Sequence, residues 1–339
     1  MKGRTIVLDH IGDTEAAALL VDGVLDDLLV DSDAPRPGTI YRAIADRPVK
    51  GQGGMFLRTP DGAAFLRQIK GLSPGQPLLV QVTGYAEPGK AIPVTQKLLF
   101  KSRYVIVTPG APGLNVSRSI RDEDRRDSLL EIAHAEMDAN SMGLILRSSC
   151  VDAYADEIAE DIRGMADLAH SVMGDVSGDA ETLTEGDAPH LYAWREWQAE
   201  DVHRAPDGFA DLGVLDQMEA LREPLVPLSG GAALYIEPTR ALVAVDVNTG
   251  GDTSPAAALK ANLACASALP RQLRLRGLGG QITLDLAPMA KKDRRAFESA
   301  LRAAFRADPT ETALVGWTPL GHFELQRKRD RIPLEACLR

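Results

Sequence analysis

The chain has 339 residues, of which 45% are hydrophobic and 25% are charged, and its formal net charge at pH 7 is −10. These proportions indicate an ordinary globular protein that is long enough for two or three units. No hydrophobic run is long enough to cross a bilayer and the N-terminus lacks a signal-peptide core, so we expect a cytoplasmic protein with no membrane partner. The three cysteines are odd in number, far apart and without a CxxC pair, which excludes a disulfide framework.

The negative charge is concentrated in one part of the sequence. Residues 152–187 contain eleven acids and a single base, so this segment accounts for the whole net charge. Residues 271–306 contain nine bases and three acids and surround Asp285. A basic stretch of this kind suits phosphate binding. The alternative is a solvated helix face, which we expect for Arg302 and Arg306.

The first hundred residues are predicted to consist of strands. Residues 4–9 and 17–30 have strand composition, with a turn at Asp22–Gly23, and a Pro/Gly-rich linker follows at 33–38. Five more short strands come next, at residues 40–45, 54–58, 64–66, 78–83 and 91–95. Five short strands within this length predict a small barrel of the OB-fold type.

The remainder is predicted to alternate helices with strands. The expected helices cover residues 119–138, 152–172, 212–222, 255–276 and 290–307. The expected strands cover residues 103–109, 142–148, 281–286 and 311–317, together with a hairpin that leads into Asp246. Pro270 is expected to kink or split the helix that contains it. Residues 174–210 have no regular period and give no prediction.

Two apolar, strand-like segments each deliver a carboxylate at the C-terminal end. Residues 241–245 lead to Asp246, and residues 279–284 lead to Asp285. Asn248 falls on the same side of an extended chain as Asp246, and a glycine pair then allows a tight turn. Carboxylate and amide oxygens suit Mg²⁺, although each aspartate could instead cap a strand or the next helix.

Four short segments around these aspartates carry a resemblance: Leu228–Ala232, Asn262–Leu263, Arg271–Gly280 and Leu284–Asp285. They resemble the catalytic core of the ribonuclease E/G family. The resemblance implies that Asp246 and Asp285 hold one Mg²⁺ and that Asn248 positions the scissile phosphate.

The resemblance also implies a fold class. We expect an α+β protein of several subdomains, with a ribonuclease-H-like fold that contains an inserted OB-fold barrel and is followed by a deoxyribonuclease-I-like α/β subdomain. The corresponding domains are residues 1–35 with 96–210, the barrel at 36–95, and the catalytic subdomain at 211–339.

The same resemblance assigns residues that contact RNA. Phe56, Phe65 and Lys90 correspond to barrel residues that grip single-stranded RNA, although from their position alone the phenylalanines could be barrel core. Arg147 and Ser148 correspond to the family's sensor for a 5′-monophosphate, with Arg118 as an accompanying contact. An ion pair between Arg147 and the acidic helix that follows is the alternative.

The C-terminal part differs from the family pattern. The chain ends at Cys337–Arg339 with no CxxC zinc-link motif, so we expect no zinc and no zinc-linked dimer, but a monomer or a dimer through another surface. Ala264 and the segment Leu286–Met289 stand where the family often has additional acids. His322 is expected to be structural and not a general base.

These features predict a Mg²⁺-dependent endoribonuclease that cleaves single-stranded RNA by attack of a metal-activated water, in RNA decay or processing, with 5′-phosphate products. Mn²⁺ could replace Mg²⁺. A catalytically weakened RNA-binding or interaction protein of the same family is the main alternative. A metal-dependent deoxyribonuclease or phosphodiesterase is a third.

Overall fold

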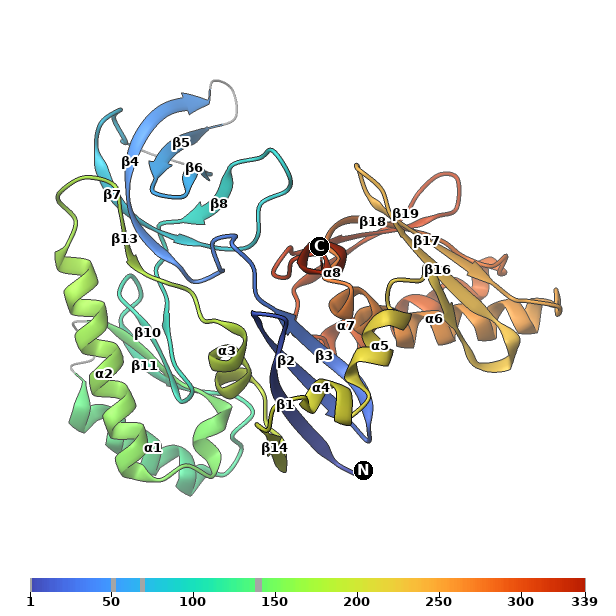
Figure 1. Cartoon of the computed structure of the whole chain (residues 1–339), viewed down its shortest axis with the longest axis horizontal. Helices are drawn as coiled ribbons and strands as arrows, with labels where there is room; N and C mark the ends of the chain where they lie inside the picture. The colour runs from blue at the N-terminus through green and yellow to red at the C-terminus, as the bar shows by residue number, and fades with distance from the viewer. Residues whose placement is uncertain (1, 50–52, 68–70, 138–141, 339) are drawn as a thin grey trace. The chain divides into compact units, whose positions relative to one another are not determined.

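The structure is a computed structural model that describes residues 2–49, 53–67, 71–137 and 142–338 (Figure 1). Contacts divide the chain into two compact units, one formed by residues 1–32 with 197–339 and the other by residues 33–196. The predicted domain boundaries stay a prediction, as do the ribonuclease-H-like and deoxyribonuclease-I-like descriptions of the subdomains.

A closed barrel occupies the first part of the unit at 33–196. Its strands pair in the order β4-β5-β6-β8-β7, and β4 also pairs with β7, which closes the barrel. The strands are β4 (Ile40–Val49), β5 (Gly54–Thr59), β6 (Gly62–Leu66), β7 (Pro77–Val82) and β8 (Ile92–Thr95). All five overlap the short strands predicted from the sequence, so the predicted small barrel is confirmed.

A smaller α/β layer completes this unit. Its sheet has the order β11-β12-β10-β9, and helices α1 and α2 contribute to the same hydrophobic core. The elements are β9 (Phe100–Lys101), β10 (Val105–Thr108), β11 (Gly113–Val116), α1 (Glu123–Glu136), β12 (Gly143–Leu146), the 3₁₀ turn η1 (Ser148–Val151) and α2 (Ala155–Gly174). Helix α1 begins later than predicted because Asp122 caps it, accepting a hydrogen bond from the Arg125 N–H at 2.7 Å.

The other unit begins with an N-terminal sheet of order β14-β1-β2-β3. Its strands are β1 (Arg4–Ile11), β2 (Thr14–Val21), β3 (Val24–Val30) and β14 (Asp201–His203), and helices α4 (Gly208–Asp211), α5 (Val214–Ala220) and α8 (Leu334–Cys337) share its core. The turn predicted at Asp22–Gly23 is confirmed, and both residues have positive φ, as a tight hairpin turn requires.

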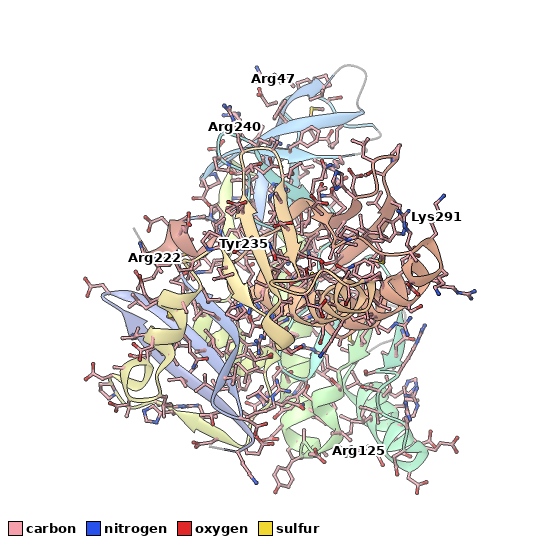
Figure 2. All side chains as sticks on the ribbon, turned by 90° about the vertical axis from the view of Figure 1, so that its right-hand side faces the viewer. Arg47, Arg125, Arg222, Tyr235, Arg240 and Lys291 are labelled. Atoms are coloured by element: carbon pink, nitrogen blue, oxygen red, sulfur yellow. The ribbon has the colours of Figure 1, made fainter. Side chains whose placement is uncertain are left out.

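The second sheet of this unit has the order β15-β16-β17-β18-β20-β19. Its strands are β15 (Leu225–Pro227), β16 (Ala233–Pro238), β17 (Val243–Asn248), β18 (Gly280–Asp285), β19 (Thr312–Trp317) and β20 (Phe323–Arg327). Alternate residues such as Val245, Ile282 and Leu284 are buried against α6 (Pro255–Leu275) and α7 (Arg294–Ala307). The other face of the sheet is open, and Tyr235 of β16 on that face is labelled in Figure 2.

Helix α6 connects β17 to the parallel strand β18 and runs without interruption through Pro270. The predicted split at this residue is therefore wrong, and a kink at Pro270 stays a prediction. An internal proline costs a helix about 3 kcal/mol through its missing N–H and its ring clash. Here Pro270 is buried, and the packing of α6 on the sheet offsets that cost.

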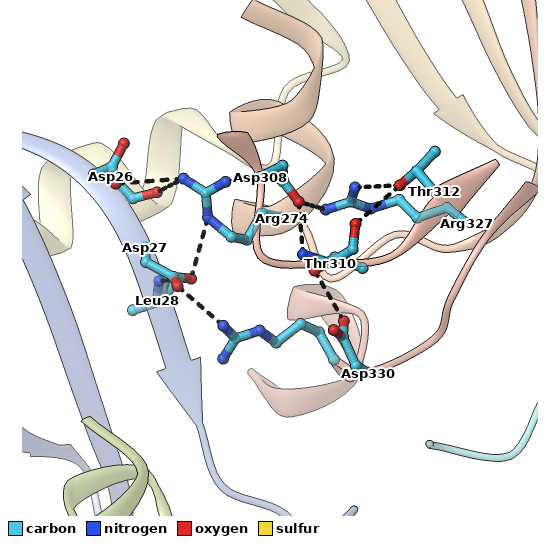
Figure 3. Close-up of polar contacts among 10 residues, drawn as sticks. Asp26, Asp27, Leu28, Arg274, Asp308, Thr310, Thr312, Arg327 and Asp330 are labelled. Atoms are coloured by element: carbon cyan, nitrogen blue, oxygen red, sulfur yellow. Dashed lines mark hydrogen bonds and ion pairs between the residues drawn. The ribbon is translucent and has the colours of Figure 1, made fainter. Parts of the chain in front are cut away.

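Buried charges join β3 to the second sheet (Figure 3). Arg274 of α6 pairs with Asp308 and donates to the Asp26 carbonyl at 2.7 Å. Asp308 also accepts from Arg327 at 2.9 Å, and Asp27 accepts from Arg331 at 3.0 Å. Arg274 therefore belongs to an internal network and contributes nothing to a phosphate-binding surface.

Residues 174–210, which have no regular period and no predicted element, contain short elements only. These are β13 (Glu181–Thr184), α3 (Pro189–Glu196), β14 and the start of α4. None of the helices in the described ranges combines the length and hydrophobicity that crossing a bilayer requires.

Candidate active site

Asp246 and Asp285 lie directly opposite each other on neighbouring parallel strands. The register of β17 and β18 pairs Val243 with Ile282 and continues to the pair Asp246–Asp285. Paired residues on adjacent strands point to the same face, so both carboxylates stand on the open face of the sheet. Both residues are exposed, whereas their strand neighbours Val245, Val247 and Leu284 are buried on the helix side.

A buried amide fixes the chain where it leaves Asp285. Asn262 of α6 is completely buried, and its side chain donates to the Ala287 carbonyl at 2.8 Å and accepts from the Ala287 N–H at 3.0 Å. This double hydrogen bond joins the crossover helix to the segment two residues beyond the carboxylate. Asn262 therefore positions the end of β18. The sequence resemblance contained this residue but assigned it no role.

The turn after β17 orients Asn248. The Asn248 Oδ1 atom accepts from the Gly250 N–H at 2.8 Å, which assigns the carbonyl side of the amide and leaves the NH₂ group as a donor. Gly250 has φ +70°, and a Cβ there would lie 2.4 Å from the Gly231 carbonyl oxygen. Only glycine fits this position, so the predicted glycine turn beside the site is confirmed.

The open face around the carboxylates is acidic. The pKa of Asp246 is raised by partial burial, then by the negative charges of Asp285 and Glu237. A divalent cation between Asp246 and Asp285 would relieve this repulsion. Among the described residues, no three His, Cys, Asp or Glu side chains form a metal-binding group. Two carboxylates with room for water fit Mg²⁺, whereas a structural zinc takes four protein ligands.

His322 lies beside the carboxylate of Asp285, a contact that the sequence analysis did not predict. Its Nδ1 atom is 3.3 Å from Asp285 Oδ1 without hydrogen-bond geometry. The residue closes a turn in which its carbonyl accepts from the Thr318 N–H at 2.8 Å. The imidazole therefore borders the site. Its sequence position, five residues after β19, gave no indication of this contact.

Tyr235 and Glu237 also stand on the open face, and the sequence analysis did not select them. Tyr235 pairs with Asp246 across β16 and β17, and Glu237 pairs with Ala244. The signal was present in the strand pattern, because Leu234 and Ile236, which alternate with them along β16, are apolar and become buried.

Phe56 and Phe65, in the other unit, lie on the outside of the barrel. They are directly paired across β5 and β6, with ring centroids 5.4 Å apart and an interplanar angle of 53°. Their strand neighbours form the barrel core, which excludes the core interpretation of these two rings. The Arg47 guanidinium lies 5.1 Å from the Phe56 centroid, and the Phe65 ring covers Gly54, where a Cβ would lie 2.4 Å from Phe65 Cζ.

Lys90 lies in the β7–β8 loop of the same barrel. Its Nζ atom is 2.7 Å from Glu87 Oε2, and its backbone N–H donates to the Glu87 carbonyl at 2.9 Å. The Lys90 side chain is largely exposed. An exposed pair of this kind contributes about 0–1 kcal/mol, so its amine can exchange Glu87 for a phosphate at little cost.

Arg118 and Arg147 follow the ends of the neighbouring parallel strands β11 and β12. Arg118 and Ser148 are exposed, and Ser148 begins η1. The Arg147 guanidinium pairs with Glu196 of α3 and donates to the Ser102 carbonyl. An ion pair thus exists, although its acid lies on α3 and not on the helix that follows Arg147. The sensor role of the three residues stays a prediction.

An exposed carboxylate pair with an adjacent amide donor on an open sheet face is the kind of site that holds a divalent cation against a phosphate. The family model described as the Ribonuclease E/G family matches residues 100–205 and 195–330. The chain belongs to this family.

Individual relatives extend over most of the chain. Ribonuclease G of Salmonella typhimurium is 27% identical over 402 aligned positions, which cover 98% of this chain and 81% of that protein. Ribonuclease E of Synechocystis sp. is 26% identical over 381 positions, which cover 93% of this chain and 55% of that protein. The alignment with Escherichia coli Ribonuclease E covers 76% of this chain and 28% of that protein. The chain thus spans about half, or less, of the length of these two ribonuclease E relatives.

Proposed function

We propose that this protein is a Mg²⁺-dependent endoribonuclease that cleaves single-stranded RNA. The observation that carries the proposal is the register that pairs Asp246 with Asp285 on the open face of the second sheet. Membership of the ribonuclease E/G family supports endoribonuclease activity and a part in RNA processing. Cytoplasmic location, Mn²⁺ in place of Mg²⁺, and a monomer or a dimer without a zinc link stay predictions.

In this proposal Asp246 and Asp285 would hold Mg²⁺. When bound, the ion supplies Lewis-acid stabilisation of a phosphoryl oxygen and lowers the pKa of water. The Asn248 NH₂ group, oriented by the Gly250 N–H, donates to the scissile phosphate. Asn262 holds the end of β18 so that the two carboxylates keep their separation. Water attacks phosphorus and forms a new P–O bond, the P–O3′ bond breaks, and a proton from water passes to O3′, which leaves a 5′-phosphate and a 3′-hydroxyl.

The barrel and the 33–196 unit supply RNA contacts in the proposal. Phe56 and Phe65 offer partly exposed rings to bases, and base stacking on an aromatic ring contributes about 1–3 kcal/mol per base. Lys90 contacts the backbone. Arg147, Ser148 and Arg118 bind a terminal 5′-phosphate, for which Arg147 exchanges its pairing with Glu196.

The experiment is cleavage of a 5′-monophosphorylated, A/U-rich single-stranded RNA oligonucleotide by the wild-type protein and Asp246→Asn, with Mg²⁺ or with EDTA. The proposal predicts Mg²⁺-dependent cleavage that is lost in the variant. Asp252→Asn is the matched control, because Asp252 is an exposed acid in the loop after β17 whose side chain accepts from the Ser254 N–H. Equal cleavage by wild type and Asp246→Asn would overturn the assignment.

A second candidate is an RNA-binding protein of the same family with weakened catalysis. The observation that favours it is that no three His, Cys, Asp or Glu side chains among the described residues form a metal-binding group. In this case wild type and Asp246→Asn bind the oligonucleotide equally well, and neither cleaves it at high protein concentration with Mg²⁺.

A further inference from the structure

A line of paired residues crosses the open face of the second sheet and passes through the carboxylates. Leu225 of β15 pairs with Tyr235 of β16, Tyr235 pairs with Asp246, and Asp246 pairs with Asp285. His322 continues the line, with its Nδ1 atom 3.3 Å from Asp285 Oδ1. Directly opposed residues on paired strands have Cβ atoms about 4.5–5.5 Å apart, so the Tyr235 ring stands immediately beside the Asp246 carboxylate.

Tyr235 and Leu225 form an exposed apolar strip at one side of the carboxylate pair. Tyr235 is 37% exposed and Leu225 is 43% exposed, whereas Leu234 and Ile236 on either side of Tyr235 are buried against the helices. The sheet core therefore does not need the Tyr235 ring. A cross-strand Tyr–Leu pair contributes roughly 0.2–1 kcal/mol to sheet stability, which is the role these residues would have without a ligand.

The ring of Tyr235 differs from three other solvent-accessible rings in this protein. Arginine guanidinium groups lie over Phe56, Trp194 and Trp317. In the parts of the chain that the structure describes, no arginine or lysine is found over Tyr235. The acidic surroundings, Asp246 and Glu237, disfavour contact between this surface and a second phosphate. A flat, uncharged group is the ligand that fits beside a phosphate held at the carboxylates.

We propose that Tyr235, extended by Leu225, stacks against the nucleobase next to the scissile phosphate. The inference rests on the proposed function, because the phosphate at Asp246 and Asp285 is what brings a base to this strip. Tyr235 and Leu225 lie on one side of the two aspartates, and His322 lies on the other side. The strip therefore contacts the nucleoside on only one side of the cleaved bond. Stacking recognises the π-face that every base has, and it therefore contributes affinity without strict sequence preference.

The test compares Tyr235→Ala and Tyr235→Phe with wild type in two measurements. Binding of a fluorescein-labelled single-stranded RNA is measured with Ca²⁺ in place of Mg²⁺, so that the carboxylates still have a hard cation while cleavage is suppressed. Loss of one stacked base weakens binding by roughly 5–150-fold in Tyr235→Ala, while Tyr235→Phe retains the affinity because it keeps the ring. Gln281→Ala is the control, since Gln281 is exposed on the same face at the far end of β18.

Abasic substitutions then identify the contact as stacking. Oligonucleotides that lack one base at each position in turn are bound by wild type and by Tyr235→Ala. The inference predicts that one abasic position weakens wild type but not Tyr235→Ala, because both changes remove the same contact. Under Mg²⁺, Tyr235→Ala raises KM with little change in kcat, because stacking is equal in the ground and transition states.

Two outcomes would overturn the inference: unchanged RNA affinity in Tyr235→Ala, or an equal loss with every abasic oligonucleotide. Thermal melting of each variant shows that the comparison is made on folded protein. Failure of the proposed function is separate, because wild type would then bind RNA without Mg²⁺-dependent cleavage while the binding comparison still gives its own answer. Wild type that neither binds nor cleaves overturns both.

Discussion

Replacement of Asp308 by alanine tests whether the buried charge network stabilises the unit formed by residues 1–32 and 197–339. The Asp308 side chain is 1% exposed and pairs with Arg274 and Arg327, whose side chains are 8% and 1% exposed. Removal of one partner from a buried ion pair costs about 3–5 kcal/mol, because the remaining charge is left uncompensated. Arg274 keeps Asp27 nearby and Arg327 keeps Thr312, so we expect the low end, about 3 kcal/mol.

Native-state hydrogen exchange measures this loss in each unit separately. A chain with two compact units need not unfold in one step, so a single midpoint would mix their stabilities. About 3 kcal/mol corresponds to roughly a hundredfold faster exchange of the most protected amides in β18 and β20. Amides of the unit at 33–196 serve as an internal reference and keep their wild-type rates.

Glu311→Ala is the matched control for Asp308→Ala. Glu311 is exposed and lies three residues away, and surface substitutions of this kind change stability by about 0.5 kcal/mol or less. Exchange in Asp308→Ala that is as slow as in Glu311→Ala would refute the reasoning. Such a result would mean that water solvates the charges of Arg274 and Arg327 in the Asp308→Ala variant.

Three further results are expected. Asn262→Ala leaves the buried Ala287 N–H and carbonyl without partners, which costs about 1–3 kcal/mol for each group and lowers the melting temperature. Phe65→Ala weakens binding of single-stranded RNA by roughly 5–150-fold, because one stacking ring is lost while Phe56 remains on β5. A fluorescence anisotropy titration measures this change. The Cys265 thiol, whose pKa is raised by burial to about 12, resists iodoacetamide in the native protein at pH 8 and reacts after unfolding.

The raised pKa of Cys265 also predicts how the free energy of unfolding changes with pH. The folded protein binds the thiol proton more tightly than the unfolded chain, whose thiol has the ordinary pKa of 9.0. Above pH 9 the unfolded state therefore loses the proton first, and stability falls as pH rises toward 12. Cys265→Ser removes this slope, and a slope of equal size in wild type and variant would contradict the assignment.

The sequence predicted elements whose pattern is local. The barrel strands β4 to β8 are short strand-like runs bounded by turn signals, and α6 and α7 have helical spacing, so each could be located without knowing its neighbours. The strands β13 and β14 have four and three residues, and they exist because they pair with β4 and β1. No local pattern specifies such a strand.

Only part of the candidate site could be predicted, because only some of its features have a local sequence pattern. Asp246 and Asp285 could be recognised as carboxylates at strand ends, but their pairing depends on a register that α6 sets across the sheet. Arg274 looked like part of a basic surface because the acids that bury it, Asp27 and Asp308, are distant in sequence. Tyr235 and His322 join the site through the neighbouring strands, which only the tertiary structure specifies.

The pairing of Asp246 with Asp285 as one metal site is tested most directly by titration with Mn²⁺, followed by electron paramagnetic resonance, using Mn²⁺ as a substitute for Mg²⁺. We expect wild type and the control Asp252→Asn to bind one Mn²⁺ with the same affinity. Asp246→Asn and Asp285→Asn should each lose more than the roughly 10–100-fold that follows loss of an outer-shell partner. Wild-type affinity in both of these variants would contradict the assignment of the two aspartates as metal ligands.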